Sequence, residues 1–282
     1  MTKKNIIQFN IEESKKNEES NLFKTEGIIT NIGVFDLEET LIASGYAMIE
    51  EYDETQVKLD SVELWIEKNS RNKELIKDNK HFKRALRLSK APLNSGHVSF
   101  AKGIVVNMDI TFSNKAWIEF QRYHFADIIT GMSTMHRISK FDLTKAFNEY
   151  VDGTIIHILM DLQKEYKENP TKENYLKLLY STPSGLLMTN RVTTNYLQLM
   201  NMYAQRHNHR LPEWRQFCEE LLEKLPLFKE LLIANGQIKE EKLNDKKDIG
   251  INPIIKSEND FKIEITAKDL EKVDEIMKGR KE

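Results

Sequence analysis

Apolar residues recur at helical spacing through residues 193–214, the segment around which the chain is organised. At about 100° per residue, one side of a helix carries Tyr196, Leu197, Leu199, Met200 and Tyr203. Another side carries Asn195, Gln198, Arg206 and, if the helix extends that far, His209. This polar stripe ends at a sharp turn before Pro212, which suits binding of a planar anion. A solvated helix face followed by a basic turn explains the pattern equally well.

The rest of the chain alternates between strand-like and helix-like segments. Residues 22–51 favour two or three strands joined by a turn near residues 36–39, and 104–112 favour another strand. Periodic apolar residues predict helices at 60–78, 82–88, 141–167, 171–179, 212–225 and 227–234, and one that begins at Asn114 with Ser113 as its N-cap. Residues 132–137 are interpreted as a loop and 181–184 as a turn. The helix at 141–167 is expected to bury Val151, Ile155, Ile156, Leu159 and Leu162. Pro212 suits the first helical position, and Trp214, Phe217, Leu221 and Leu222 form the next apolar stripe.

These segments predict one main domain with extensions at both ends. Residues 1–20 read as a polar tail and 21–235 as an α+β domain. Residues 236–248 read as a charged linker, and 249–282 as a small strand–helix appendage.

Composition and charge argue against a nucleic-acid-binding or membrane protein. The chain has 282 residues, 40% hydrophobic and 30% charged, with a formal net charge of -2. No global positive field recruits nucleic acid or an anionic membrane, and no apolar run approaches the roughly 20 residues that span a bilayer. The N-terminal residues lack the apolar core of a signal peptide. We therefore expect a cytoplasmic protein that binds neither nucleic acid nor membrane.

The usual catalytic and metal-binding motifs are missing from the sequence. Cys218 is the only cysteine, so an intramolecular disulfide is excluded. It falls in the apolar stripe beside Phe217 and Leu221, where packing is favoured over nucleophilic catalysis. His207 and His209 would diverge on a helix, which argues against a metal pair.

Candidate ligand-binding residues fall in two separated stretches. The first holds Arg122, Tyr123, His124, Ser133, His136 and Arg137, and the second Asn195, Asn201, Arg206, His209 and Arg210. Guanidinium groups bind phosphates through paired hydrogen bonds, and amides read the edges of planar rings. The alternative is that Arg122 pairs with Glu119 and that the second stretch is simply surface.

Residues 93–225 resemble the flavin-dependent thymidylate synthases. The family places Gly-His before a Ser/Thr and a Phe, followed by a strand and a helix ending in Arg-His-Arg. Seven further residues separate that motif from a serine. This chain has Gly96-His97-Val98-Ser99-Phe100, then Arg122-Tyr123-His124 and Ser133. Farther on, Pro183, Asn195, Leu199-Met200-Asn201 and Arg206 keep the family spacing without a gap. His209 and Trp214 follow with one residue of slippage.

Several positions depart from the family pattern. Tyr123 and His124 replace the signature His and Arg, and eight residues separate His124 from Ser133. Positions expected to carry carboxylates or arginines around the nucleotide and flavin hold Ala101, Thr130, Leu179 and Leu197. Arg137 is a candidate replacement for the arginine that normally follows the serine.

The resemblance implies a central antiparallel sheet flanked by helices, assembled as a homotetramer with sites between subunits. It implies that FAD, NADPH and methylenetetrahydrofolate are used to methylate dUMP to dTMP without a cysteine nucleophile. Carried over, Arg122 and Arg206 would be catalytic and hold the pyrimidine nucleotide, and Ser133 and Arg137 would hold its phosphate. The flavin would contact His97, Ser99, Tyr123, His124, Asn195, Asn201 and His209.

Two alternatives to this reaction remain. One is a different modification of a pyrimidine nucleotide, with the flavin lost or repurposed. The other is a non-enzymatic nucleotide-binding or structural assembly protein that retains the scaffold with a degenerate flavin site.

Overall fold

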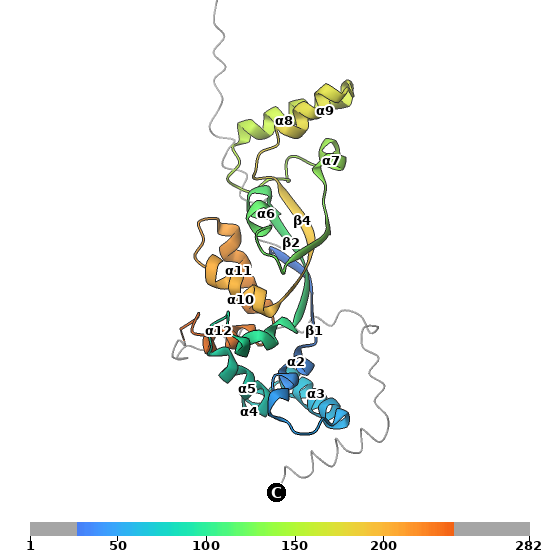
Figure 1. Ribbon diagram of the computed structural model, residues 1–282. Helices are drawn as coiled ribbons and strands as arrows, with labels where there is room; N and C mark the ends of the chain where they lie inside the picture. Colours follow the sequence, from blue (N-terminus) through green and yellow to red (C-terminus); the bar gives the residue numbers. More distant parts are fainter. Residues whose placement is uncertain (1–26, 240–282) are drawn as a thin grey trace, which may run out of the picture. The chain divides into compact units, whose positions relative to one another are not determined.

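A four-stranded antiparallel sheet lies at the centre of the fold. The computed structural model describes residues 27–239. The strands are β1 (Ile29–Phe35), β2 (Val105–Ser113), β3 (Asp127–Gly131) and β4 (Leu187–Asn195), in the order β1-β2-β4-β3 (Figure 1). Helices flank the sheet, so the fold belongs to the predicted α+β class.

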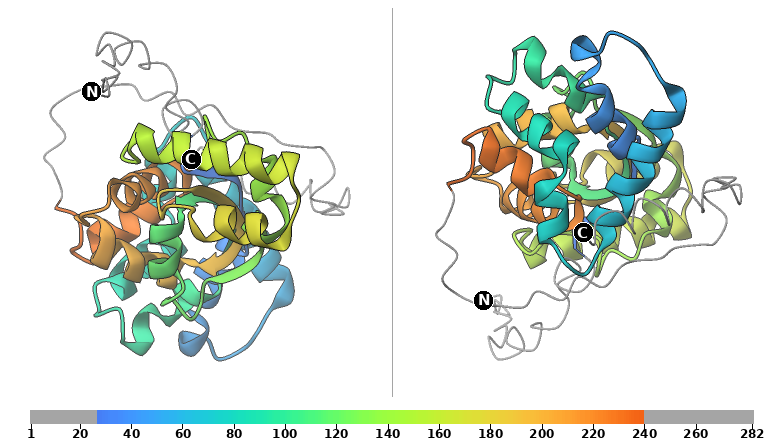
Figure 2. Two further views of the ribbon diagram at one scale, coloured as in Figure 1. Left: turned by 90° about the horizontal axis from the view of Figure 1, so that it is seen from above. Right: turned by 90° about the horizontal axis from the view of Figure 1, so that it is seen from below.

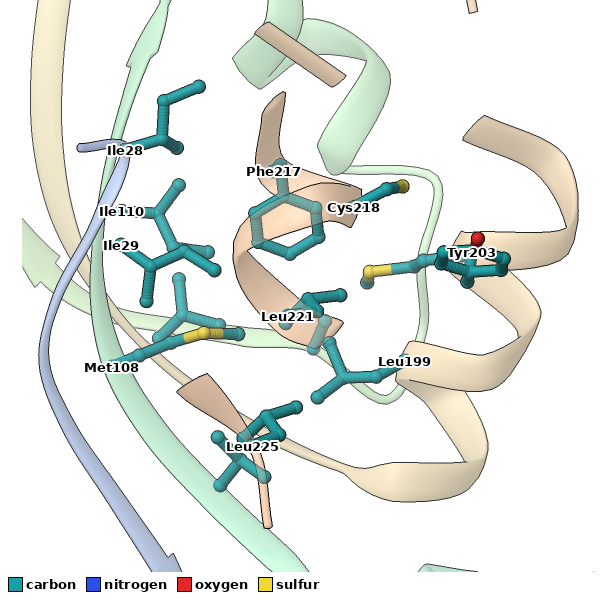
Figure 3. Packing of buried hydrophobic residues seen from close by; sticks show 14 of the residues in the cluster. Ile28, Ile29, Met108, Ile110, Leu199, Tyr203, Phe217, Cys218, Leu221 and Leu225 are labelled. Atoms are coloured by element: carbon teal, nitrogen blue, oxygen red, sulfur yellow. The ribbon is translucent and has the colours of Figure 1, made fainter. Parts of the chain in front are cut away.

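The sheet has one buried face because side chains alternate along each strand. Val106, Met108, Ile110 and Phe112 of β2 are fully buried. They face helices α10 (Tyr196–Arg206) and α11 (Pro212–Lys224). Figure 3 shows side chains of β1 and β2 pointing toward those of α10 and α11.

The opposite face of the sheet carries polar pairs between neighbouring strands. The Thr193 hydroxyl donates to Asn107 Oδ1 (2.7 Å), and the hydroxyls of Thr111 and Thr189 lie 2.8 Å apart. Arg191 pairs with Asp109 at 3.1 Å. Such cross-strand pairs contribute to the stability of a sheet.

Two helical groups complete the described segment. The first contains α2 (Leu37–Ala43), α3 (Glu54–Asn69), α4 (Glu74–Asp78), α5 (Lys80–Ser89), the 3₁₀ helices η2 (Tyr46–Met48) and η3 (Gly96–Lys102), and α12 (Phe228–Ala234). Within it α12 packs beside α5 (Figure 2). The second contains α7 (Thr134–Arg137), the 3₁₀ helix η4 (Ile138–Lys140), α8 (Gly153–Glu168) and α9 (Lys172–Tyr180), whereas α6 (Asn114–Phe120) follows β2 directly.

Several predicted helix features are confirmed. The Ser113 hydroxyl accepts from the Ala116 N–H (3.2 Å) and caps α6. Pro212 occupies the first turn of α11, where Trp214, Phe217 and Leu221 are buried. Helix α12 ends where predicted, at Asn235 and Gly236.

The N-terminal strand prediction is only partly correct. Residues 29–35 form β1, but 37–43 are helical and 46–48 form a 3₁₀ turn instead of a second strand. The helix expected at 60–78 is two helices, because Ser70 adopts an extended conformation that ends α3. Helix α3 also begins earlier, since Asp53 accepts the N–H groups of Thr55 and Gln56 as an N-cap.

The prediction of a helix at 141–167 is wrong for the first half of that range, because the helix begins at Gly153. Asp152 accepts the Thr154 N–H (2.8 Å) and starts α8 at Gly153. The preceding residues turn and form an isolated bridge, Phe147↔Leu186, just before β4. Of the five residues expected to be buried there, only Leu159 is; Ile155 is 42% exposed. Helix α8 therefore presents much of its apolar side outward.

Two strands were not predicted. Strand β4 includes residues 193–195, which the sequence pattern assigned to a helix, and β3 includes Thr130 and Gly131. Residues 132–137 are not a continuous loop, because Thr134–Arg137 form α7. The predicted tail (1–20), the appendage (249–282) and most of the linker (236–248) lie outside the described residues.

A buried histidine connects the helices near the N-terminus. His81 Nε2 lies 2.7 Å from Asp60 Oδ2, and Arg84 Nη2 lies 2.9 Å from His81 Nδ1. The same guanidinium donates to the carbonyls of Leu41 and Ile42. These contacts suit a neutral ring with its proton on Nε2, because a proton on Nδ1 would face Arg84.

We expect the free energy of unfolding to decrease as the pH falls below 6.5, the ordinary pKa of histidine. Burial lowers the pKa of His81 against the opposing carboxylate of Asp60, and the charges of Arg84 and Lys80 lower it further. The folded state therefore favours the neutral ring. The stability that depends on a neutral His81 is lost as the pH falls from 6.5 through the lower pKa of the folded state. Urea unfolding at pH 7.5 and 5.5 measures the effect. His81→Gln should weaken this pH dependence, whereas substitution of the exposed His136 should not; equal pH dependence in His81→Gln and the parent contradicts the prediction.

Candidate functional site

The two stretches singled out in the sequence meet where α6 and α10 end. The Arg206 side chain donates from Nη1 to Glu119 Oε2 (2.9 Å) and from Nε to the Tyr123 hydroxyl (2.8 Å). Tyr123 belongs to the first stretch of sequence and Arg206 to the second, and Glu119 lies just before the first stretch. Residues more than 80 positions apart thus form one cluster, which we call the Arg206 cluster: Glu119, Tyr123, Arg206, His209 and Trp214.

Aromatic rings support the guanidinium of Arg206. Its central carbon lies 4.8 Å from the ring centroid of Trp214 and 5.7 Å from that of Tyr123. Trp214 in turn stacks on Phe120 at an interplanar angle of 11°. Cation–π contacts in a partly desolvated place strengthen the hold on an arginine, so its position is fixed before any ligand arrives.

His209 contacts both Arg206 and Glu119 of the cluster. Its Nε2 is 2.8 Å from Arg206 Nη1 and 3.3 Å from Glu119 Oε2, and the Leu211 N–H donates to its Nδ1. Each ring nitrogen therefore faces a donor, the Leu211 N–H at Nδ1 and Arg206 Nη1 at Nε2, and a neutral ring can accept at only one of them. Burial lowers the pKa of His209, and although Glu119 opposes this, the positive charges of Arg206, Arg210 and Arg215 lower it further. The ring is therefore neutral near pH 7.

Tyr123 is engaged on both sides of its hydroxyl. The hydroxyl accepts from Arg206 and donates to Gln205 Oε1 (3.0 Å), and the side chain is buried. Burial raises the pKa of Tyr123, against the neighbouring Arg206. The neutral Tyr123 phenol therefore positions Arg206. Both hydrogen bonds of its hydroxyl are made to side chains of the same chain.

The other residues of the first stretch, apart from Ser133, are exposed. Arg122, His124 and Arg137 have no side-chain partner among residues 27–239, and Ser133 is half-buried. Strand β3, 5 residues long, separates Arg122 and His124 from Ser133 and Arg137. At about 3.4 Å per residue this is roughly 17 Å. The chain therefore does not bring Ser133 and Arg137 to the Arg206 cluster.

The remaining predicted flavin contacts lie nearer the start of α10. Asn195 caps this helix by accepting the Gln198 N–H (2.9 Å), and Asn201 donates to the Leu197 carbonyl (3.0 Å). His97 and Ser99 lie on η3, which packs against α10. The 11 residues of α10 separate Asn195 from Arg206 by roughly 16 Å at about 1.5 Å per residue.

These residues fit a flavin only in part. The exposed His97 and His124, without side-chain partners in the described segment, are available to an anionic group. In contrast, Ser99 donates to the Gly96 carbonyl (2.6 Å), and Tyr123 and Asn201 are bonded within the chain.

Sequence reasoning missed Glu119 as a partner of Arg206. Glu119 was considered only as a neighbour of Arg122. Trp214 was considered as part of an apolar stripe and as a match to the family spacing, but not as a contact of Arg206. The 87 positions between Glu119 and Arg206 leave no local pattern that connects them.

Two other predictions concern thiol and metal chemistry. Cys218 is buried as predicted, and desolvation, with a smaller effect of Glu219, raises the pKa of its thiol to about 12. Within residues 27–239, the His, Cys, Asp and Glu side chains form no group of three that could hold a metal ion. No helix of the described segment is both long enough and apolar enough to cross a bilayer.

Comparisons with known proteins give a distant structural likeness. No protein-family model and no curated protein sequence matches the chain. A crystal structure of the flavin-dependent thymidylate synthase ThyX from Helicobacter pylori, complexed with FAD and dUMP, is 18% identical with a TM-score of 0.46, covering 73% of this chain and 96% of that one. A second structure of ThyX from this organism with FAD and dUMP is 16% identical with the same TM-score, covering 73% and 95%. Likeness this distant says nothing about the ligands or reaction of this chain.

Proposed function

We propose that the protein binds a pyrimidine deoxynucleotide and methylates dUMP to dTMP, or carries out a closely related modification of such a nucleotide. The resemblance of residues 93–225 to the flavin-dependent thymidylate synthases supports this proposal. The geometric support is the Arg206 cluster, because it unites residues from both stretches that carry the resemblance.

The proposed roles follow the charges and positions of the side chains. Arg206 and Arg122 would contact the base and stabilise negative charge that develops on it. Arg137 and Ser133 would hold the phosphate, and the exposure of Arg137 leaves its guanidinium available for paired hydrogen bonds.

The proposed cofactor is FAD, with NADPH and methylenetetrahydrofolate as co-substrates. When bound, the flavin supplies the redox chemistry, while the protein supplies position and electrostatics. His97, Ser99, Tyr123, His124, Asn195, Asn201 and His209 are the residues proposed to hold it. His209, being neutral, could accept or donate a hydrogen bond near pH 7 without adding charge.

A second candidate is a non-enzymatic nucleotide-binding or assembly protein. It is favoured by the internal hydrogen bonds of Tyr123 and Asn201, which leave fewer groups for a flavin. The absorbance spectrum of the purified protein separates the two candidates. Flavin absorption in the visible range, together with dTMP formation from dUMP, methylenetetrahydrofolate and NADPH, is expected for the enzyme. A colourless protein that gains no flavin on incubation with FAD and forms no dTMP supports the second candidate.

We also propose that the protein is a homotetramer. The separation of Arg137 from the Arg206 cluster within one chain supports a site shared between copies. Exposed apolar side chains also support it, such as Ile129 on the edge strand β3 and Ile158 on α8. Closed symmetric assemblies are the usual outcome for such chains. Light scattering should give a multiple of 33.1 kDa, and a monomer at every concentration would contradict a shared site.

A further inference from the structure

The guanidinium of Arg206 already has an anionic partner within the chain. Glu119 Oε2 accepts from Arg206 Nη1 at 2.9 Å, and the two side chains are only 16% and 12% exposed. A carboxylate oxygen at this distance occupies the place that an oxygen of an anionic ligand would take at Nη1. Any anion that approaches this nitrogen therefore competes with Glu119.

The other contacts of the guanidinium strengthen this competition. Nε donates to the Tyr123 hydroxyl, and Nη1 also faces His209. Within residues 27–239 the hydrogen bonds found for Arg206 use Nε and Nη1, which leaves Nη2 for a ligand. A forked contact to an anion needs two neighbouring donors, so it requires Glu119 or Tyr123 to move away.

We propose that Glu119 keeps anionic groups off Arg206, so that the ligand group which meets this arginine is uncharged. The paired side chains offer a donor and an acceptor side by side, which suits the edge of a neutral heterocycle. The consequence for the nucleotide rests on the proposed function: its base, not its phosphate, meets Arg206. The phosphate then binds at Arg137, whose side chain is exposed.

Substitution of Glu119 by glutamine tests this selection. Glutamine keeps the shape and an accepting oxygen but removes the charge. Inorganic sulfate is titrated into the parent and the Glu119→Gln variant while NMR follows the His209 ring, which lies 2.8 Å from Arg206 Nη1. Because a charged competitor is removed, we expect sulfate to bind the variant tighter, on the order of tenfold. The Arg206→Gln change added to Glu119→Gln should abolish this gain.

A matched control removes an equal charge elsewhere. Glu173 pairs with Lys177 on the exposed side of α9, and Glu173→Gln should bind sulfate as the parent does. The proposal is overturned if Glu119→Gln and the parent bind sulfate equally, if Glu173→Gln shows the same gain, or if the gain survives loss of Arg206. Should Glu119→Gln fail to fold, Glu119→Ala is measured instead against the same expectations.

A separate measurement tests whether the base of the nucleotide, and not its phosphate, meets Arg206. In the parent, deoxyuridine, which lacks the phosphate, should perturb the His209 ring signals as dUMP does. A response to dUMP without one to deoxyuridine would show that the phosphate meets Arg206. If neither compound binds at all, the proposed function fails, whereas the sulfate titrations still decide the role of Glu119.

Discussion

Replacement of Glu220 by alanine is expected to destabilise the protein by about 3–5 kcal/mol, the cost of breaking a buried ionic contact. The Glu220 carboxylate is almost fully buried and accepts the backbone N–H groups of Ile28 (2.7 Å) and Ile29 (2.8 Å), while Lys224 donates to it at 2.7 Å. It thereby fixes the start of β1 on α11. Gly27 has a positive φ of 75°, and a Cβ there would come within 2.8 Å of the carboxylate. Alanine would leave two buried N–H groups without their acceptor.

Urea unfolding compares Glu220→Ala with Glu219→Ala, which alters the exposed neighbour on the same helix. We expect Glu219→Ala to change the free energy of unfolding by no more than about 0.5 kcal/mol. Glu220→Gln should fall between the two, because one amide oxygen can still accept. Similar free energies for Glu220→Ala and Glu219→Ala would show that β1 does not depend on this carboxylate.

The second large effect is expected from Arg206→Lys. A cation at a helix C-terminus gains about 0.3–1 kcal/mol from the helix dipole, a gain that lysine keeps, so that role alone predicts a nearly silent change. The contacts of Arg206 predict more, because lysine cannot donate to Tyr123 and Glu119 together or present a flat guanidinium to Trp214. Loss of one charged hydrogen bond costs roughly 1.5–3 kcal/mol. We therefore expect lower stability and a nucleotide affinity about tenfold to a hundredfold weaker.

Arg87→Lys provides the control, since Arg87 is an exposed arginine in the last turn of α5. Thermal unfolding and nucleotide titration of both variants separate the two effects. If Arg206→Lys lowers stability but leaves nucleotide affinity unchanged, the Arg206 cluster is structural and not a binding site.

The helices around the site could be predicted because their burial follows helical periodicity. Tyr196, Leu199, Met200 and Tyr203 of α10 are buried, as their spacing indicated. Pro212 likewise marked the start of α11. In these segments the local pattern and the final packing agree.

Strand β4 could not be predicted because only some of its side chains face the core. Along it, Thr189, Arg191 and Thr193 bond to partners on β2, so the segment lacks an apolar stripe. Strand β3 has all five residues exposed and offers even less signal. Polar cross-strand pairs become recognisable only when the neighbouring strand is known.

The contacts of the Arg206 cluster likewise could not be predicted without knowing which elements are neighbours. The sequence indicated Arg206 and Tyr123, but their contact and the role of Glu119 depend on how α6 packs near α10. Arg122 was expected either to bind a ligand or to pair with Glu119. Instead Glu119 pairs with Arg206, and Arg122 has no side-chain partner within residues 27–239.

Isothermal titration of the purified protein with dUMP, dCMP and dTMP tests the central claim most directly. We predict saturable heat for at least one of these pyrimidine deoxynucleotides and a matching rise in melting temperature, with weaker binding in Arg206→Lys. The absence of heat and of a thermal shift with all three at millimolar concentration would contradict the claim that this protein binds a pyrimidine deoxynucleotide.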